Sequence, residues 1–259
     1  MERSRTDYVK RNIFYGYVST VVSSLFSIVV RTVFVYTLGV SYLGIAGLFT
    51  NVLGVLSFSE LGIGSAIVFA LYKPIAQEDT EKIKSLLALY KKAYRLIAAV
   101  VAVIGIVLVP FLQYLVHSEI PLAQVRIYYL IFLFNTVSSY FVSYKNSYIS
   151  ALQKEYIVTN VTTIGNVVTN CAQMVLLLLG GDYLAYLLTA AVIGLLQKIA
   201  TVCYLNRRYP ILTDRDVKPL DAETQKRIWR NVKALIVHQI GDVSVNQTDN
   251  IIISSFVST

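Results

Sequence analysis

Charged residues are scarce in this sequence, and this scarcity limits what kind of protein it encodes. Lys, Arg, Asp and Glu together make up 15% of the 259 residues, whereas 56% of the residues are hydrophobic. A water-soluble domain usually carries about a quarter charged residues. The composition therefore excludes an ordinary soluble protein and indicates that lipid is the main solvent of the chain.

Cysteine, histidine and catalytic motifs are also sparse. The two cysteines, Cys171 and Cys203, lie inside apolar runs, where we expect buried thiols. No Cys/His cluster has the spacing of a metal site. The sequence contains no HExxH motif, nucleophile elbow or phosphate-cradling loop. We therefore predict neither a metal, a cofactor nor an enzymatic activity.

Long apolar runs are what the sequence has in abundance. A spanning helix needs about 20 predominantly apolar residues. Six runs meet this requirement, and a seventh begins near Val232; the six are Ile13–Leu38, Leu43–Leu71, Leu96–Leu115, Ile127–Tyr148, Ile157–Leu179 and Tyr183–Leu205. The sequence thus predicts an all-α membrane protein that crosses the bilayer at least six times.

The basic residues are distributed unequally between the connections. They gather before the first run and then in every second connection, at Lys73–Arg95, Lys145–Lys154 and Arg207–Lys233. The alternate connections hold a single basic residue, Arg126. Because Lys and Arg are retained on the cytoplasmic side, the N-terminus is predicted to be cytoplasmic. The net charge of +8 is thus spread along a membrane surface, and we predict no nucleic-acid partner.

Arg31 is an ionisable residue inside the first apolar run, where a charge is costly. At about 100° per residue, Tyr17, Thr20, Ser24 and Ser27 share its helix face. This hydroxyl stripe predicts that the face lines a cavity and binds substrate. The alternative is that Arg31 extends to the headgroups, about 10 Å away, as an interfacial anchor.

Two further ionisable residues, Glu60 and Lys198, are candidate substrate-binding groups. Glu60 lies near mid-depth and has three open roles: pairing with Arg31 or Lys198, binding a proton, or accepting backbone hydrogen bonds. Lys198 either faces a cavity or extends to the interface. A polar stripe from Thr159 to Gln173 is more typical of hydrogen bonding between helices than of a ligand site.

The seventh run is the most polar. His238, Asp242, Asn246 and Asp249 share one face of a helix at these spacings. Two carboxylates and an imidazole on one face of a spanning helix indicate a proton- or cation-coupling site, or partners for basic groups on other helices.

A weak internal repeat indicates how the chain is divided. Arg11-Asn12 precedes the first run, and Arg230-Asn231 precedes the seventh. Since six crossings return the chain to its starting side, the seventh helix would open a second, parallel set. We predict a six-helix transmembrane lobe over residues 1–206, a cytoplasmic linker over 207–231 and the first helix of a second lobe over 232–259. The sequence is thus expected to be part of a longer protein.

The stretch from Arg31 to Pro74 carries a family resemblance, most clearly RTVFVYTLGVSYLGIAGLFTNVLG, SELGIGSA and YKP. It resembles bacterial O-antigen and capsule flippases of the Wzx type, in the multidrug/oligosaccharidyl-lipid/polysaccharide exporter superfamily. The resemblance continues more weakly to TDNIII at Thr248–Ile253. It implies a two-lobe transporter of twelve to fourteen helices in the bacterial cytoplasmic membrane. The implied substrate is an undecaprenyl-diphosphate-linked oligosaccharide, translocated by alternating access.

Two alternatives remain. A cation-coupled multidrug exporter of the same superfamily would have an acidic, aromatic cavity in its first lobe, whereas Glu60 is the one acidic residue deep in the six runs. A membrane enzyme acting on lipid-linked sugars would present a sizeable outer loop, and the predicted outer connections are short. We therefore expect a flippase.

Overall fold

The computed structural model describes residues 5–116, 120–214, 216–220, 223–226, 228–231, 234 and 237; for residue 5 and residues 58–62 it describes the backbone alone. Over these ranges every regular element is a helix, as the composition predicts. Five helices are long and apolar enough to cross a membrane. They are α1 (Arg5–Leu38), α4 (Thr80–Leu108), α6 (Leu122–Ala151), α7 (Tyr156–Leu178) and α8 (Tyr183–Arg208). The predicted all-α membrane fold is confirmed.

The second predicted crossing is two helices rather than one. The run Leu43–Leu71 is divided between α2 (Val40–Leu56) and α3 (Phe58–Ala76), with the break at Ser57. The Ser57 hydroxyl donates to the Leu53 carbonyl at 2.9 Å and accepts from the hydroxyl of Tyr140 at 2.9 Å. Tyr140 is buried in α6, so the break is anchored to the centre of the bundle. Hydropathy alone could not show it, because both helices are apolar.

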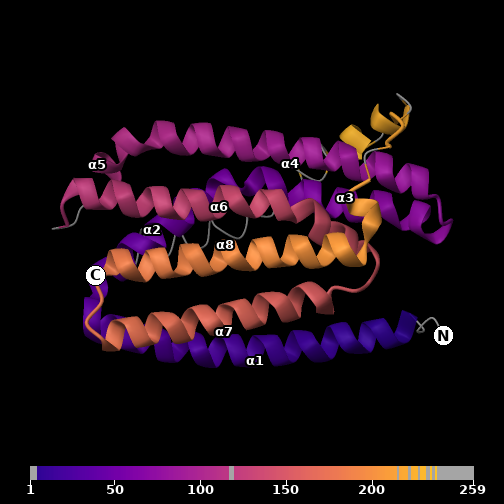
Figure 1. Ribbon diagram of the computed structural model, residues 1–259. Coiled ribbons are helices and arrows are strands. Elements are labelled where there is room, and N and C mark those ends of the chain that lie inside the picture. The colour runs from indigo at the N-terminus through magenta and orange to yellow at the C-terminus, as the bar shows by residue number, and fades with distance from the viewer. Residues whose placement is uncertain are drawn as a thin grey trace.

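The long helices lie side by side in an order that differs from their order in the sequence. Figure 1 shows α4, α6, α8, α7 and α1 following one another across the view, and each of these neighbours is in contact. Helices α2 and α3 pack against α6. Large aromatic side chains fill the core, among them Phe49, Tyr90, Tyr129 and Tyr183.

The connections at one end of the bundle are short. Gly39 joins α1 to α2 with a φ of 88°, a left-handed conformation that glycine adopts without strain. After α4, a 3₁₀ turn (η1, Val109–Phe111) that contains Pro110 and the short α5 (Leu112–Leu115) close the same end.

The predicted basic connections meet at the opposite end (Figure 1). There Asn12 of α1 donates to the carbonyl of Gln153 at 2.9 Å and accepts from the amide of Tyr156 at 2.9 Å. Arg11 lies over the Tyr156 ring, 5.6 Å from its centroid. The start of α1 is thereby fastened to the turn between α6 and α7.

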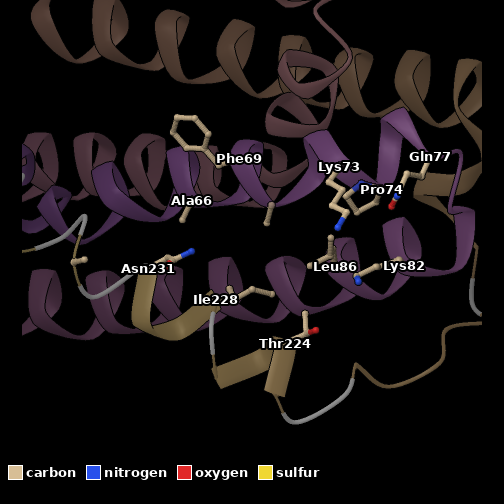
Figure 2. A pocket seen from close by; sticks show the side chains of 12 residues that line it. Ala66, Phe69, Lys73, Pro74, Gln77, Lys82, Leu86, Thr224, Ile228 and Asn231 are labelled. Atoms are coloured by element: carbon tan, nitrogen blue, oxygen red, sulfur yellow. The ribbon is translucent and has the colours of Figure 1, made fainter.

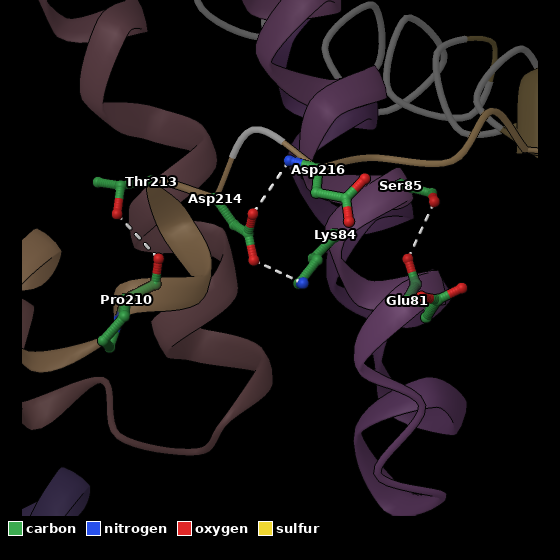
Figure 3. Close-up of polar contacts among 7 residues, drawn as sticks. All are labelled: Glu81, Lys84, Ser85, Pro210, Thr213, Asp214 and Asp216. Atoms are coloured by element: carbon green, nitrogen blue, oxygen red, sulfur yellow. Dashed lines mark hydrogen bonds and ion pairs between the residues drawn. The ribbon is translucent and has the colours of Figure 1, made fainter.

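The segment after α8 also lies against this end. Following η2 (Pro210–Leu212), Asp214 pairs with Lys84 of α4 at 2.5 Å, as Figure 3 shows. Lys218 pairs with Glu81 at 2.6 Å, and this hydrogen bond raises the pKa of Lys218. The carbonyl of Lys218 accepts from the Ser85 hydroxyl at 2.6 Å. The predicted linker is therefore held against the first turns of α4, and its residues 223–226 and 228–231 are helical.

One minor expectation was wrong. Cys203 was expected to be a buried thiol, but its side chain is exposed, and Cys171 is only partly buried. Cys203 lies on a face of α8 that no described helix covers, so apolar surroundings in the sequence did not mean burial in the bundle.

Candidate functional site

Arg31 lines a pocket at the end of α1 that approaches α2. The pocket has a volume of about 270 Å³. Five helices contribute to it: α1, α2, α6, α7 and α8. Its polar lining residues are Ser27, Arg31, Asn170, Tyr183 and Tyr186. Of the side chains described there, Arg31 is the one with a formal charge.

Aromatic rings form one wall of this Arg31 pocket. Phe34 lies edge-on to Tyr186 with centroids 5.0 Å apart, and Tyr42 lies 4.6 Å from Tyr183. Tyr183 is 2% exposed, and its hydroxyl has no hydrogen-bond partner among the described residues. Because this hydroxyl oxygen is itself inaccessible, the polar groups that the pocket offers to a ligand come from Ser27, Arg31, Asn170 and Tyr186. The pocket thus combines a cation, neutral donors and an apolar wall.

The structure separates the predicted stripe on α1 into two parts. Ser27 joins Arg31 in the pocket. Tyr17, Thr20 and Ser24 lie on an exposed face of α1 beyond it, where the Thr20 hydroxyl donates to the carbonyl of Gly16 at 3.0 Å. Tyr17, Thr20 and Ser24 point away from α7, and no described helix covers this face of α1.

Lys198 does not lie in the Arg31 pocket. It donates to the Asn135 carbonyl at 3.0 Å and to the Ser138 hydroxyl at 2.7 Å, joining α8 to α6. These partners account for its charge at membrane depth without a substrate or an interface. The side chain of Glu60 and the predicted coupling residues His238, Asp242, Asn246 and Asp249 lie outside the described residues.

The polar stripe on α7 is used mainly between helices. Thr163 forms a hydrogen bond with Ser19 of α1 at 2.6 Å, and Gln173 donates to the carbonyl of Tyr186 at 3.1 Å. For these two residues the interhelical interpretation is confirmed. Asn170 differs, because it reaches the Arg31 pocket.

A second cavity, between α3 and α6, was missed by the sequence analysis. Its volume is about 670 Å³, and hydroxyl and amide groups dominate its polar lining: Ser65, Tyr72, Tyr94, Ser143, Asn146, Ser147 and Ser150. Glu155, at the turn before α7, lies at its edge. The signal was present in the sequence, since Thr136, Ser139, Ser143, Ser147 and Ser150 recur every three or four residues.

The hydroxyls of this α6 cavity are arranged to accept hydrogen bonds. Ser143 donates to the carbonyl of Ser139 at 3.1 Å, and Ser147 donates to that of Ser143 at 3.1 Å. Each hydroxyl thereby uses its proton within the helix and keeps acceptor lone pairs. The buried Oδ1 of Asn146 has no partner among the described residues. The free lone pairs of Ser143 and Ser147 can therefore accept hydrogen bonds from a polyhydroxylated ligand in the cavity.

The bundle of apolar helices has the fold of solved transporters. One is described as the outward-facing conformation of a multidrug resistance MATE family transporter of the MOP superfamily. It is 19% identical to this chain and superposes with a TM-score of 0.62. The match covers 92% of this chain and 54% of the transporter. A MATE mutant has a TM-score of 0.64 at 17% identity, and the match covers 98% of this chain and 58% of the mutant. MATE in complex with MaD3S has a TM-score of 0.63 at 17% identity, and the match covers 97% of this chain and 58% of that MATE chain.

The family is shown by the sequence itself. The model of the family described as "Polysaccharide biosynthesis protein" matches residues 9–259. The chain belongs to that family and is a multi-pass membrane protein with the fold of MATE transporters. No curated protein matches it. The chain spans little more than half the length of the solved structures that it matches.

Proposed function

We propose that this chain is the first lobe of a flippase that moves a polyprenyl-diphosphate-linked oligosaccharide across the cytoplasmic membrane. The observation that carries the proposal is the Arg31 pocket, whose one described charge is a guanidinium. The family, named for polysaccharide biosynthesis, supports a carbohydrate substrate. The fold supports transport rather than catalysis.

The chemistry of Arg suits a lipid diphosphate. Its planar fork binds phosphate oxygens in pairs, and it keeps its charge at any physiological pH. Ser27, Asn170 and Tyr186 add neutral hydrogen-bonding groups around it. A drug cation would instead be repelled by the Arg31 charge.

The remaining parts of such a substrate have matching surfaces. The lone pairs of Ser143, Ser147 and Ser150 can accept hydrogen bonds from sugar hydroxyls. The polyprenyl chain can stay in lipid beside the lobe. In the complete protein, residues 1–206 would form one lobe, 207–231 the linker and 232–259 the start of the second lobe. Alternating access is then rocking of the two lobes about the site between them.

Export in a strain lacking its own flippase tests the role of Arg31. We expect Arg31→Gln in the complete protein to abolish polysaccharide export, and Arg31→Lys to retain part of it, because Lys keeps the charge but loses the fork. The readout is surface polysaccharide normalised to membrane protein level. Full export by Arg31→Gln would make Arg31 an interfacial anchor. Loss of resistance to cationic drugs with unchanged export would favour the multidrug alternative.

The acidic face of the seventh run supplies a separate test of coupling. His238, Asp242, Asn246 and Asp249 are proposed to bind the coupling ion, since their spacing places them on one helix face. Asp249→Asn is expected to change the pH or sodium dependence of export, whereas Ile252→Val is not. If the export of Asp249→Asn depends on pH and on sodium as the wild type does, these groups are partners of basic residues on other helices and not a coupling site.

A further inference from the structure

A further pocket lies at the basic end of the bundle; it shares no lining residue with the Arg31 pocket and only Phe69 with the α6 cavity. It has a volume of about 540 Å³ and lies between the last turns of α3, the first turns of α4 and the helical part of the linker. Figure 2 shows the side chains of Lys73 and Lys82 pointing into the space between these three elements. We refer to it as the linker pocket.

The charges in the linker pocket are unbalanced. Lys73 and Lys82 both line it, and neither forms an ion pair with a described carboxylate. Of the three carboxylates between the two lysines in the sequence, Glu78 is exposed and does not line the pocket, and the other two have partners elsewhere. Asp79 accepts from the backbone amide of Lys82 at 3.0 Å, and Glu81 pairs with Lys218. The described lining contains no acidic residue, so the pocket is positive.

The other lining residues make the pocket amphipathic. Gln77 and Asn231 add amide donors beside the lysines, while Phe69 and Ile228 form apolar walls. Phe69 is 68% exposed, so the apolar side is open to the surroundings of the bundle. A ligand that fits has an anionic head and an apolar body.

The position of the linker pocket places it at the membrane surface. The apolar helix α3 ends at Ala76 and α4 begins at Thr80, so the pocket lies where the spanning segments leave the bilayer. Trp229, next to Ile228, is 39% exposed, and tryptophan is enriched at this level of a membrane. Basic pockets between helices at this depth bind the headgroups of anionic lipids.

We propose that the linker pocket binds an anionic phospholipid of the adjacent leaflet. The phosphodiester lies between Lys73 and Lys82, and the first methylenes of an acyl chain lie along Phe69. The lipid thereby joins α3 to the linker that leads to the second lobe. This inference does not depend on the proposed function or on the substrate of the Arg31 pocket.

The test uses the complete protein in nanodiscs of phosphatidylcholine, titrated with phosphatidylglycerol and analysed by native mass spectrometry. For Lys73→Gln with Lys82→Gln we expect the apparent affinity for phosphatidylglycerol to fall about tenfold or more, since each lysine near a membrane surface contributes to binding anionic lipid. Lys10→Gln with Lys92→Gln is the matched control, because both lysines are exposed at the same end and neither lines the pocket. This control is expected to bind as the wild type does.

A second variant tests the shape of the site without changing its charge. Ala70 lines the pocket, and Ala70→Phe is expected to fill it and to weaken phosphatidylglycerol binding to a similar extent. Phosphatidylglycerol should also raise the Tm of the wild type and of Arg31→Gln, but not of the double lysine variant. Equal binding by the double variant and its control would overturn the proposal. So would saturation of the site by inorganic phosphate or polyprenyl diphosphate without any effect of phosphatidylglycerol.

Discussion

At the scale of single residues, polar side chains in this bundle divide into those that join helices and those that face cavities. Asn12 and Lys198 belong to the first group, since their hydrogen bonds connect α1 with the α6–α7 turn and α8 with α6. Arg31 and Asn170 belong to the second. The residue type does not decide the group, because a polar atom at membrane depth bonds to whatever the neighbouring helix offers.

Asn12 offers the clearest stability prediction of this kind. Asn12→Ala removes one donor and one acceptor and leaves the carbonyl of Gln153 and the amide of Tyr156 without their partner. We expect a loss of about 1–3 kcal/mol in the free energy of unfolding, measured as a lower Tm in detergent. Asn12→Asp should lose part of this, because a carboxylate accepts from Tyr156 but cannot donate. Asn51→Ala, at an exposed position of α2, is the control; an equal Tm for Asn12→Ala and Asn51→Ala would contradict the prediction.

At the scale of elements, close helix contacts depend on glycine at specific positions. In α7, a Cβ at Gly165 would collide with the side-chain amide of Gln197 from α8. In α2, by contrast, a Cβ at Gly44 would meet nothing within 4 Å. A Cβ is thus crowded by a neighbouring side chain in one helix and has open space in the other.

These two glycines form a matched pair of variants. Gly165→Ala should lower stability by about 1 kcal/mol, the low end of the overpacking range, because the end of the Gln197 side chain can shift, and Gln197→Ala should restore most of that loss. Gly44→Ala should be neutral or stabilising by up to about 1 kcal/mol, because alanine is the better helix former. The readout is the Tm of the single and double variants. Additive effects of Gly165→Ala and Gln197→Ala would show that the two residues do not meet in the protein.

At the scale of the whole molecule, the bundle gathers its basic connections at one end (Figure 1). The N-terminal turn of α1, the α3–α4 turn, the α6–α7 turn and the linker all lie there. The opposite end carries the short connections at Gly39 and at Asp182. This asymmetry supports the orientation proposed from the sequence, with the N-terminus in the cytoplasm.

Cysteine labelling in intact cells tests the orientation. Single cysteines at Ser41 and Asp182, in a background without Cys171 and Cys203, are expected to react with an impermeant thiol reagent added from outside. A cysteine at Thr213, next to the linker's ion pair with Lys84, should react only after the membrane is permeabilised. Labelling at Thr213 in intact cells would reverse the proposed topology.

The sequence by itself determined the class of the protein and most of its long apolar helices, and it placed the basic residues in every second connection. These properties depend on local composition, because a helix must satisfy its own backbone in lipid and because charge bias acts on each connection separately. It also singled out Arg31, since a charge inside an apolar run is rare for an energetic reason.

Only the tertiary structure decided which polar groups meet. It divided Leu43–Leu71 into two helices at Ser57. It bonded Lys198 of α8 to α6 and brought Asn170 into the same pocket as Arg31. It also turned the serines of α6 and the two lysines of the linker pocket towards cavities. These outcomes depend on contacts between helices far apart in the sequence, and helical periodicity gives the face of a side chain but not what lies opposite it.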